Sequence, residues 1–545
     1  MRAQRLALVV VGLGLLAART AQASNVTEFP DNGSEQMGRG GAWIARASDP
    51  LAAFYNPAGL AGQDTKLTLS VNLPFLQTCF ARVAAANDQT ADPFITSGTP
   101  FPKVCGDVGT FPTPSIGFNY RISPRVGAAL LIVAPNGAAS SAWPEFVTDS
   151  NGKLQPAPER YLLTYSNALF ITPTIAVGWE PVNNLRFGAS FQWGIAAATL
   201  SNASMAVNAN GLSPASNDVK ASISASSFFV PGFTLGAMWS AAPMLDVAAW
   251  YKFSAPIDAS GDVKTYANYY DPNAAVVTGD TSKPDCGDGS GINKGCAPGL
   301  AHLKIPVPME AKIGVRFHKP RKALDSEITE HRRDPLSQDV WDLEADFTWA
   351  NDSAIDNLEV RFPSANDGTA VLPVNGTGGR LPPNADVRHH FRDVLGVRLG
   401  GDYNAIPDRL AVRAGAFFES QAADSQYQNL DFVSGARIGL ALGGTLRIPV
   451  KKDASPAKGG LIELSLGYMH VFVTDLNNND PNNPGLPALA GTTCNGGSFS
   501  GGSPTNVGTC GPTNPTTPFR SNWAVNLGTI SNSLDVINVG AAYRF

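Results

Sequence analysis

Hydrophobic and polar residues alternate with a period of two over many stretches of this chain. In WDLEADFTW, residues 341–349, the odd positions are apolar, whereas the even positions are three acids and a threonine. Successive side chains of a β-strand point to opposite faces, so this pattern predicts strands with one apolar and one polar face. The same alternation recurs at 309–317, 409–419, 437–448 and 461–470.

Strand-like segments of this kind are separated by stretches rich in Gly, Pro, Asn and Asp, which favour turns and loops. Counting the segments between these stretches predicts fourteen strands. Their expected ranges are 66–73, 113–121, 124–134, 167–180, 185–200, 228–240, 244–256, 305–317, 337–349, 391–402, 409–420, 437–449, 460–473 and 534–545.

The links between the predicted strands alternate in length. Those after the second, fourth, sixth and tenth strands are only a few residues long, whereas the links after odd-numbered strands are long, as at 135–166 and 474–533. Short turns on one side, long loops on the other and an even number of strands are typical of a bacterial outer-membrane β-barrel. The one long link on the short-turn side, 318–336, is rich in charge, and we expect it to be a solvated periplasmic excursion.

A water-soluble β-sandwich also has alternating strands, so the spacing of the links carries this interpretation. In hydrocarbon each unpaired backbone group costs several kcal/mol, and strands can therefore cross a membrane only as a closed sheet. The polar face must then line the lumen, because a Lys or Arg at the lipid midplane costs about 2–4 kcal/mol. We expect an all-β fold, a transmembrane antiparallel β-barrel of about 14 strands, over residues 66–545.

The chain begins with features of a signal peptide, which we assign to residues 1–23. Arg2 and Arg5 precede an apolar run, and AQA at 21–23 supplies the small residues of a cleavage site. Residues 24–65 precede the first strand and are too long for a simple tail. We expect them to enter the barrel as a small N-terminal hatch, or plug, with short helices.

Charge and cysteine content limit the possible chemistry. A net charge of −5 argues against a nucleic-acid partner. The cysteine spacings fit neither a zinc site nor haem attachment, the histidines show no metal-ligand spacing, and no Gly-x-Ser-x-Gly motif occurs, so we expect no metal, no cofactor and no enzymatic activity. In an exported chain, three local cysteine pairs predict three loop disulfides: Cys79–Cys105, Cys286–Cys296 and Cys494–Cys510.

The segment MGRGGAWIARASDPLAAFYNPAGLAG, residues 37–62, has a run of small residues and a short predicted helix that starts near Asp49 and stops before Pro57. We expect its glycines to allow close backbone packing and Asn56 to bond nearby backbone. This segment is similar to the N-terminal hatch of the FadL/TodX outer-membrane transporters of long-chain fatty acids and other hydrophobic compounds. The motif residues are Gly38, Gly40, Gly41, Asn56, Pro57 and Ala58.

The resemblance implies a monomeric channel in the bacterial outer membrane, surrounded by lipid and lipopolysaccharide. A hydrophobic ligand, a fatty acid or a hydrocarbon, would be captured among the extracellular loops, pass through the plugged lumen and leave sideways near the third strand. Gly127 and Pro135 are candidate points of broken pairing there. The alternative is that Gly127 only packs and Pro135 only ends the strand.

A fatty acid would require a cation in the lumen. The candidates on polar strand faces are Lys252, Lys312, Arg316 and Arg413, although acids share these faces and most of the cations are expected to be paired with them. Two other functions are open: a general diffusion porin, which would have no plug, and a loop-based surface adhesin, which would keep its function without the hatch.

Overall fold

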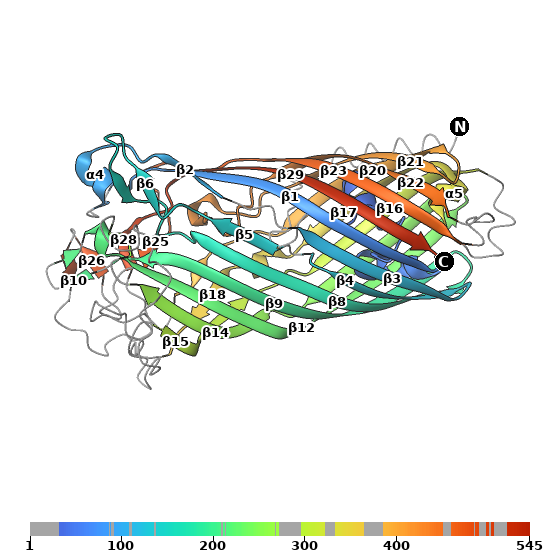
Figure 1. The fold of residues 1–545 in the computed structure, drawn as a ribbon, viewed down its shortest axis with the longest axis horizontal. Coiled ribbons are helices and arrows are strands. Elements are labelled where there is room, and N and C mark those ends of the chain that lie inside the picture. Colours follow the sequence, from blue (N-terminus) through green and yellow to red (C-terminus); the bar gives the residue numbers. More distant parts are fainter. Residues whose placement is uncertain are drawn as a thin grey trace.

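A computed structural model of the chain describes residues 32–86, 88, 92–107, 112–135, 138–205, 207–208, 211–212, 214–266, 269–271, 296–321, 333–363, 385–450, 459–483, 485–489, 498–500, 503–505 and 520–545. It is an elongated β-barrel with long links at one end, and with short turns and the C-terminus at the other (Figure 1). By the usual asymmetry of such barrels, the long links are extracellular and the short turns periplasmic.

Fourteen antiparallel strands form the closed wall. Each is hydrogen-bonded to its neighbour in chain order, and the last strand pairs with the first from Lys66↔Arg544 to Arg82↔Gly528. The wall strands are β1 Lys66–Arg82, β3 Thr113–Ser123, β4 Val126–Val133, β8 Tyr165–Val182, β9 Leu185–Ser204, β12 Val219–Ala242, β13 Leu245–Ser254, β16 Glu310–Pro320, β17 Asp339–Ala350, β20 Val394–Ile406, β21 Leu410–Glu419, β22 Arg437–Pro449, β23 Leu461–Val473 and β29 Gly528–Arg544.

The two faces of the wall strands point as the alternation predicts. In β17, Leu343 and Phe347 are 47% and 60% exposed on the outside, whereas Glu344 and Asp346 are fully buried inside. Since the outer residues meet lipid and the inner ones meet the lumen, the expected polar interior is confirmed.

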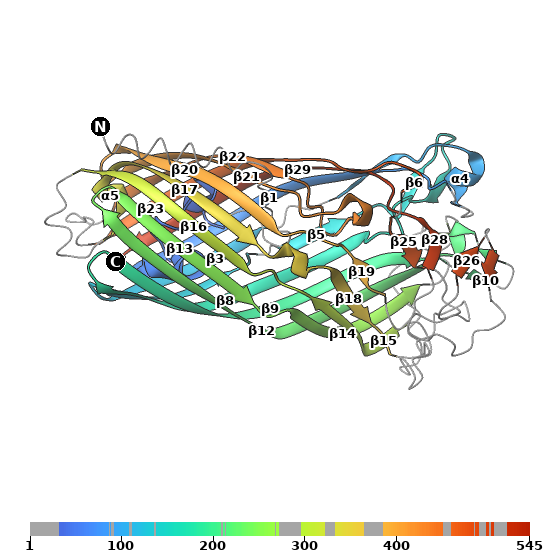
Figure 2. The same ribbon diagram turned by 180° about the vertical axis from the view of Figure 1, so that it is seen from behind.

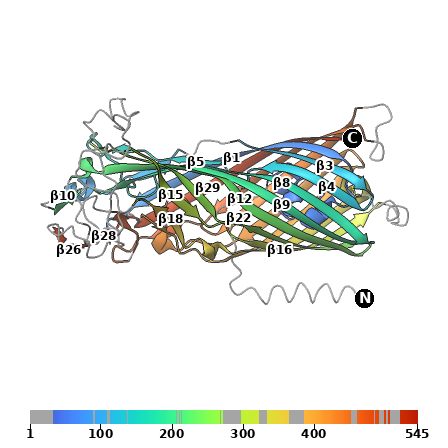
Figure 3. The same ribbon diagram turned by 90° about the horizontal axis from the view of Figure 1, so that it is seen from below.

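Several strands are longer than the sequence indicates. β12 has 24 residues and would be about 80 Å long at 3.3 Å per residue, whereas the apolar band of such barrels is only about 25 Å tall. β1 likewise runs on to Arg82, so Cys79 lies in a strand and not in a loop. Residues predicted as loops thus lengthen the wall at the end that carries the long links, as Figures 2 and 3 show.

The extracellular end is built from shorter strands and contains a large apolar cluster that includes Phe80, Trp143 and Trp523. The shorter strands are β2 Lys103–Gly106, β5 Ala138–Ala142, β6 Phe146–Thr148, β7 Leu154–Pro156, β10 Val207–Asn208, β11 Gly211–Leu212, β14 Ile257–Tyr266, β15 Cys296–Ile305, β18 Asn357–Arg361, β19 Val387–Arg388, β24 Leu476–Asn478, β25 Pro487–Leu489, β26 Ser498–Ser500, β27 Ser503–Thr505 and β28 Arg520–Ala524.

The helices are all short. In the described part of the chain, none is long and apolar enough to cross a membrane. They are α2 Ser34–Gly38, α3 Ala52–Tyr55, η1 Pro57–Leu60, α4 Pro93–Ser97, η2 Ala215–Asn217, α5 Pro335–Gln338, η4 Asp352–Ala354 and η5 Ser425–Tyr427.

Residues 32–65 lie inside the periplasmic half of the barrel, where α2, α3 and η1 are enclosed by the strands (Figures 1 and 2). α2 packs against β22 and β23, and η1 packs against β8, β9 and β12 on the other side of the lumen. The segment therefore spans the lumen from wall to wall. The assigned signal peptide, 1–23, lies outside the described residues.

Candidate functional site

The N-terminal segment approaches the wall so closely that glycines are needed on both sides. A Cβ atom at Gly188 of β9 would lie 2.2 Å from the Pro57 carbonyl carbon, and one at Gly400 of β20 would lie 2.1 Å from the Arg39 oxygen. On the segment itself, Gly40 has φ +61° and a Cβ there would lie 2.8 Å from the Ala416 nitrogen. The contact is backbone against backbone.

Asn56 holds the turn between α3 and η1. Its Nδ2 donates to the Ile44 oxygen at 2.9 Å, and its Oδ1 accepts from the Ala58 nitrogen at 3.2 Å. Asp49 accepts from the Leu51 nitrogen at 2.8 Å, one turn before the helix. The side chain of Asn56 therefore bonds nearby backbone, as the sequence suggests, and fixes where Pro57 enters the next turn.

Two arginines attach the segment to the acidic inner face of the wall. Arg39 Nη1 lies 2.6 Å from Asp342 Oδ1 and 2.7 Å from Asp402 Oδ1, and Arg46 pairs with Asp342 and with Glu35. Burial alone would lower the pKa of Arg39, but the two aspartates hold it above its ordinary value. Burial would likewise raise the pKa of Glu35, and Arg46 and other cations lower it to about 2. Both pKa directions favour the charged forms of Arg39 and Glu35.

The periplasmic link between β16 and β17 also enters the barrel. Asp334 is 2% exposed and accepts from Arg447 Nη2 at 2.9 Å and from Arg544 Nη1 at 2.7 Å. Arg333 donates to the carbonyl oxygens of Gly59 and Arg46 at 3.2 Å and 2.9 Å. The expectation of a solvated excursion over 318–336 is therefore wrong for the described residues 333–336. Their charges meet counter-charges and carbonyls inside the barrel, whereas 322–332 lie outside the described residues.

The four candidate cations differ in their surroundings. Arg316 forms ion pairs with three acids, Asp246, Asp339 and Asp342. Arg413 Nη2 lies 3.3 Å from Asp402 Oδ2. Lys252 pairs with Glu310. Each of these three is therefore already compensated by acids of the wall.

Lys312 has no carboxylate within ion-pair distance among the described residues. Its Nζ lies 4.8 Å from the ring centroid of Trp250 and 5.6 Å from that of Tyr55. The Trp250 indole in turn donates to the Phe54 oxygen of the N-terminal segment at 3.1 Å. An ammonium group that lies between aromatic rings of β13 and of the N-terminal segment is suited to bind an anionic group of a ligand.

An apolar cavity that is partly open lies in the lumen farther toward the extracellular end, and its space, open solvent included, is about 610 Å³. Its walls come from β8, β9, β12, β14, β15 and the link after β15, and Phe432 of the link between β21 and β22 faces it from inside the lumen. The lining residues that decide its character are Phe170, Ala196, Ala225, Ala259, Leu303 and Ile305. No charged residue lines it, so the cavity suits a hydrocarbon ligand.

The wall is interrupted between β1 and the link that joins β4 to β5. β3 pairs with residues 66–72 of β1 and β2 with 78–81, so within the described chain residues 73–77 have ladder partners on β29 only. Pro135 lies in this region, between the end of β4 and the start of β5.

Gly127 lies away from this interruption. It pairs with Arg121 on one side and Gly178 on the other, and a Cβ there would lie 2.2 Å from the Leu60 oxygen. The expectation of broken pairing at Gly127 is therefore wrong, and this glycine serves close packing with the N-terminal segment.

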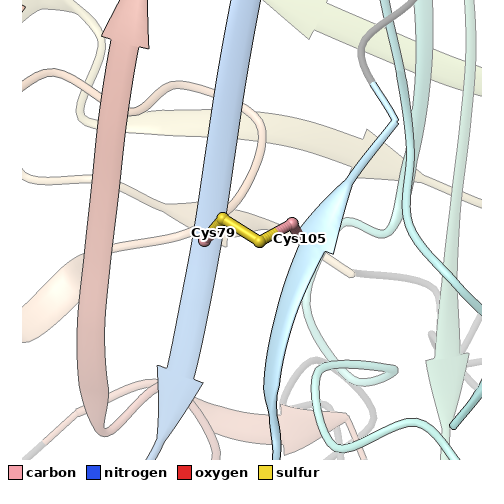
Figure 4. Close-up of a disulfide and its surroundings, with 2 residues drawn as sticks. All are labelled: Cys79 and Cys105. Atoms are coloured by element: carbon pink, nitrogen blue, oxygen red, sulfur yellow. A yellow bond between two sulfur atoms is a disulfide. The ribbon is translucent and has the colours of Figure 1, made fainter.

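The first of the expected disulfides is present. Cys79 of β1 and Cys105 of β2 are directly paired residues of the ladder, with Cα atoms 3.9 Å apart (Figure 4). It ties the strand β2 to the extension of β1. The predicted pairs Cys286–Cys296 and Cys494–Cys510 involve side chains outside the described residues. Within the described chain, no cluster of three His, Cys, Asp or Glu residues could hold a metal ion.

Sequence reasoning missed Arg39 and Arg46 as the anchors of the N-terminal segment. Their signal was a pair of arginines in an otherwise small and apolar segment, matched by the acids on the inner face of 342–346. It also missed the cavity, because β12, one of the strands that line it, changes the phase of its alternation at 227–230.

These features define a class: an outer-membrane β-barrel whose N-terminus folds into its own lumen. A sequence profile of the outer membrane protein transport proteins (OMPP1/FadL/TodX) matches residues 14–455. The chain belongs to this family and is a protein of the bacterial outer membrane. No curated protein sequence matches it significantly.

Solved structures show the same fold. A Pseudomonas aeruginosa FadL homologue is similar with a TM-score of 0.63 and 16% identity, covering 96% of this chain and 100% of the other. The toluene transporter TbuX of Ralstonia pickettii is similar with a TM-score of 0.52 and 13% identity, covering 96% and 99%. These likenesses support the fourteen-stranded closed barrel.

Proposed function

We propose that the protein takes up hydrophobic small molecules, either long-chain fatty acids or hydrocarbons, across the outer membrane. The observation that carries this proposal is the apolar cavity between the inner faces of β8, β9, β12, β14 and β15, which no charged residue lines. A ligand gains about 0.8 kcal/mol for each buried methylene, so such a cavity selects apolar molecules from water. No step of this transport requires covalent chemistry, and we assign no enzymatic activity.

In this proposal, residues 24–65 act as a hatch that closes the lumen, with Gly38, Gly40, Gly41, Asn56, Pro57 and Ala58 as its packing motif. The buried contacts of this segment with opposite walls support a seal, which a general diffusion porin would lack. A loop-based adhesin would not need an apolar cavity connected to the barrel wall. The working unit is a monomer in a membrane of lipid and lipopolysaccharide.

The ligand would leave sideways at the interruption near Pro135. There β1 has no ladder partner over residues 73–77 on the side of β2 and β3. The cavity reaches Ala168 and Leu169 of β8, and Leu169 pairs with Ala138 at the start of β5. A molecule that moved from the cavity into lipid at this point would stay in an apolar environment throughout.

A cavity-filling substitution tests the proposal. Ala196→Trp should occupy the cavity and reduce uptake of a radiolabelled fatty acid or toluene at least tenfold. Ala189→Trp, on the same strand but exposed to lipid, is the matched control and should leave uptake within twofold. Equal uptake by the two folded variants would contradict the proposal, as would undiminished uptake after deletion of residues 34–62 with no rise in ion conductance.

A further inference from the structure

A second region of the wall, between β12 and β16, has an unusual construction. In the extracellular half of β12, Val219, Ile223 and Ala225 point inward, whereas in the periplasmic half the inward positions are Thr234 and Met238. The inward positions are odd in the first half and even in the second. The change of phase occurs at the register shift between Ser227 and Val230.

The neighbouring strand pair changes phase at the same level. β13 continues into β14, and its inward residues change from even numbers, such as Lys252, to odd numbers, such as Ala259. β15 continues into β16, and its inward residues change from odd numbers, such as Leu303, to even numbers, such as Lys312. A shift of one residue exchanges the two faces of a strand. In β12, in β13–β14 and in β15–β16, the set of positions that faces the lumen therefore changes at the same level.

The outer surface of the wall changes from apolar to polar at this exchange. On the outer surface of β16, Ile313 and Phe317 are 58% and 51% exposed, whereas the outer residues of β15 include the charged Lys304. Below the exchange the wall is apolar outside and polar inside, and above it the wall is polar outside and apolar inside. The apolar cavity begins where the two arrangements meet.

The hydrogen-bond ladder is open at this level. β12 pairs with β14 up to Ser226 and with β13 only from Gly232 onward. On the other side, the β13–β16 ladder ends at Lys252↔Glu310, and the β14–β15 ladder begins at Ile257↔Ile305. Between these ladders the Ala255 nitrogen donates to the Pro231 oxygen at 2.9 Å. We call this region, residues 227–231, 253–256 and 306–309, the second seam.

Prolines make such an opening compatible with lipid. An unpaired backbone N–H in hydrocarbon costs several kcal/mol, but proline has none. Pro231, Pro256, Pro306 and Pro308 all lie in the second seam. The Phe228 oxygen, freed by the bulge, accepts from the Trp193 indole at 2.7 Å on the outer surface. The four prolines thus remove four donors that an open seam would otherwise leave without a partner.

The seam has apolar side chains on both sides. Inside, the cavity is lined by Ile257, Pro306 and Val307 of the seam and its border. Outside, Phe228 and Phe229 are 73% and 53% exposed. The side chains named here are uncharged, and the charged groups that border the seam are the Lys252–Glu310 ion pair inside and Asp258 and Lys304 outside.

We propose that the second seam is another lateral passage, through which the apolar part of a ligand moves between the cavity and the outer leaflet. The proposal rests on the proposed function and extends it, since one cavity then opens to lipid at two places, at Pro135 and at the second seam. Four wall strands separate the two openings.

Stapling the seam tests this. The pairs on either side share one register, which places Ala255 opposite Val307, so the double variant Ala255→Cys, Val307→Cys should form a disulfide across the seam. The control double variant Ala414→Cys, Leu442→Cys staples an outward-facing pair of the intact β21–β22 ladder. A second test variant, Pro256→Ala with Pro306→Ala, supplies two N–H donors that can close the ladder.

Uptake of a radiolabelled long-chain fatty acid, and separately of toluene, is measured in vesicles before and after mild reduction. We expect the seam staple to slow uptake of at least one probe threefold or more, and reduction should reverse this effect. Equilibrium binding of the probe in detergent should stay within twofold. The control staple should have no effect, and the proline variant should slow uptake similarly. Unchanged uptake in both seam variants, or a loss that follows a loss of binding, would overturn the second passage alone. Absence of uptake by the unmodified protein would overturn the proposed function as well.

Discussion

Arg39 of the N-terminal segment and Asp342 of β17 form a fully buried ion pair, with Nη1 and Oδ1 2.6 Å apart and both side chains at 0% exposure. The arginine comes from a segment that precedes every strand, and the aspartate comes from the ninth strand of the wall. This pair therefore fixes the segment in the lumen through a contact between residues 303 positions apart.

Arg39→Ala should remove the cation that Asp342, Glu344 and Asp402 share. Other arginines stay beside the two aspartates, whereas Glu344 loses its one ion pair within the described chain. Removing one partner of a buried ion pair destabilises a protein by about 3–5 kcal/mol. We expect lower thermal stability of the folded barrel in detergent and larger ion conductance, both partly restored by Arg39→Lys. Lys304→Ala breaks an exposed pair with Glu359 and is the control, with a cost of at most about 1 kcal/mol. Equal effects of the two alanine variants would contradict an anchoring role.

Gly188→Ala should disturb the seating of the N-terminal segment. Its Cβ would lie 2.2 Å from the Pro57 carbonyl carbon and 2.3 Å from the Ala58 nitrogen, and these backbone atoms can move only if the whole turn moves. Overpacking of this kind costs about 1–3 kcal/mol. Single-channel recording should detect a higher conductance. Gly444→Ala, where the nearest atom is the Ala411 oxygen at 3.2 Å, should behave as the unmodified protein.

Lys312→Met separates the two ligand classes. If the ammonium group meets a fatty-acid carboxylate, its loss removes a charge-assisted hydrogen bond of about 1.5–3 kcal/mol, or about tenfold or more in affinity. Toluene binding should stay the same, because it has no anionic group. Equilibrium binding of both probes to purified protein measures this, and equal fatty-acid affinity would exclude Lys312 as the carboxylate partner.

Phe347→Arg should impair assembly of the barrel. The ring is 60% exposed on the lipid face, and an arginine near the lipid midplane costs about 2–4 kcal/mol. Phe347→Leu, which keeps an apolar surface, is the control. The folded fraction in liposomes, measured by heat-modifiable migration on gels, should fall for the arginine variant alone.

The packing of the extracellular links should weaken as the pH rises. Burial raises the pKa of Glu159 to about 8, against 4.5 for an ordinary glutamate, and neither carboxylate oxygen has a hydrogen-bond partner within the described chain. The folded state therefore binds this proton more tightly than the unfolded state, so the stabilisation is complete below about pH 4.5 and is lost as the pH rises through 8. Tryptophan fluorescence, which senses the nearby Trp143 cluster, should change between pH 7 and 9.

Glu159→Gln supplies the control for this pH dependence. The amide keeps the shape of the protonated acid but does not ionise, so the change between pH 7 and 9 should flatten. A transition of the same size in both proteins would assign it to another group.

The sequence by itself determined the closed barrel and its polarity, because period-two alternation and the alternating link lengths are local properties of the chain. WDLEADFTW already placed Leu343 outside and Glu344 inside. The short turn at Asn56–Pro57 was also local in part, since Asn56 Oδ1 accepts from the Ala58 nitrogen two residues on.

Only the tertiary structure decided which charges were used and where the lumen turns apolar. Lys312 and Arg316 look alike in a strand pattern, but Arg316 meets acids from β13 and β17, and Lys312 meets aromatic rings of β13 and the N-terminal segment. The cavity likewise depends on β8, β9, β12, β14 and β15 meeting around one space. Such contacts join positions far apart in sequence, and their free energies exist only once the barrel has closed, so no local pattern could encode them separately.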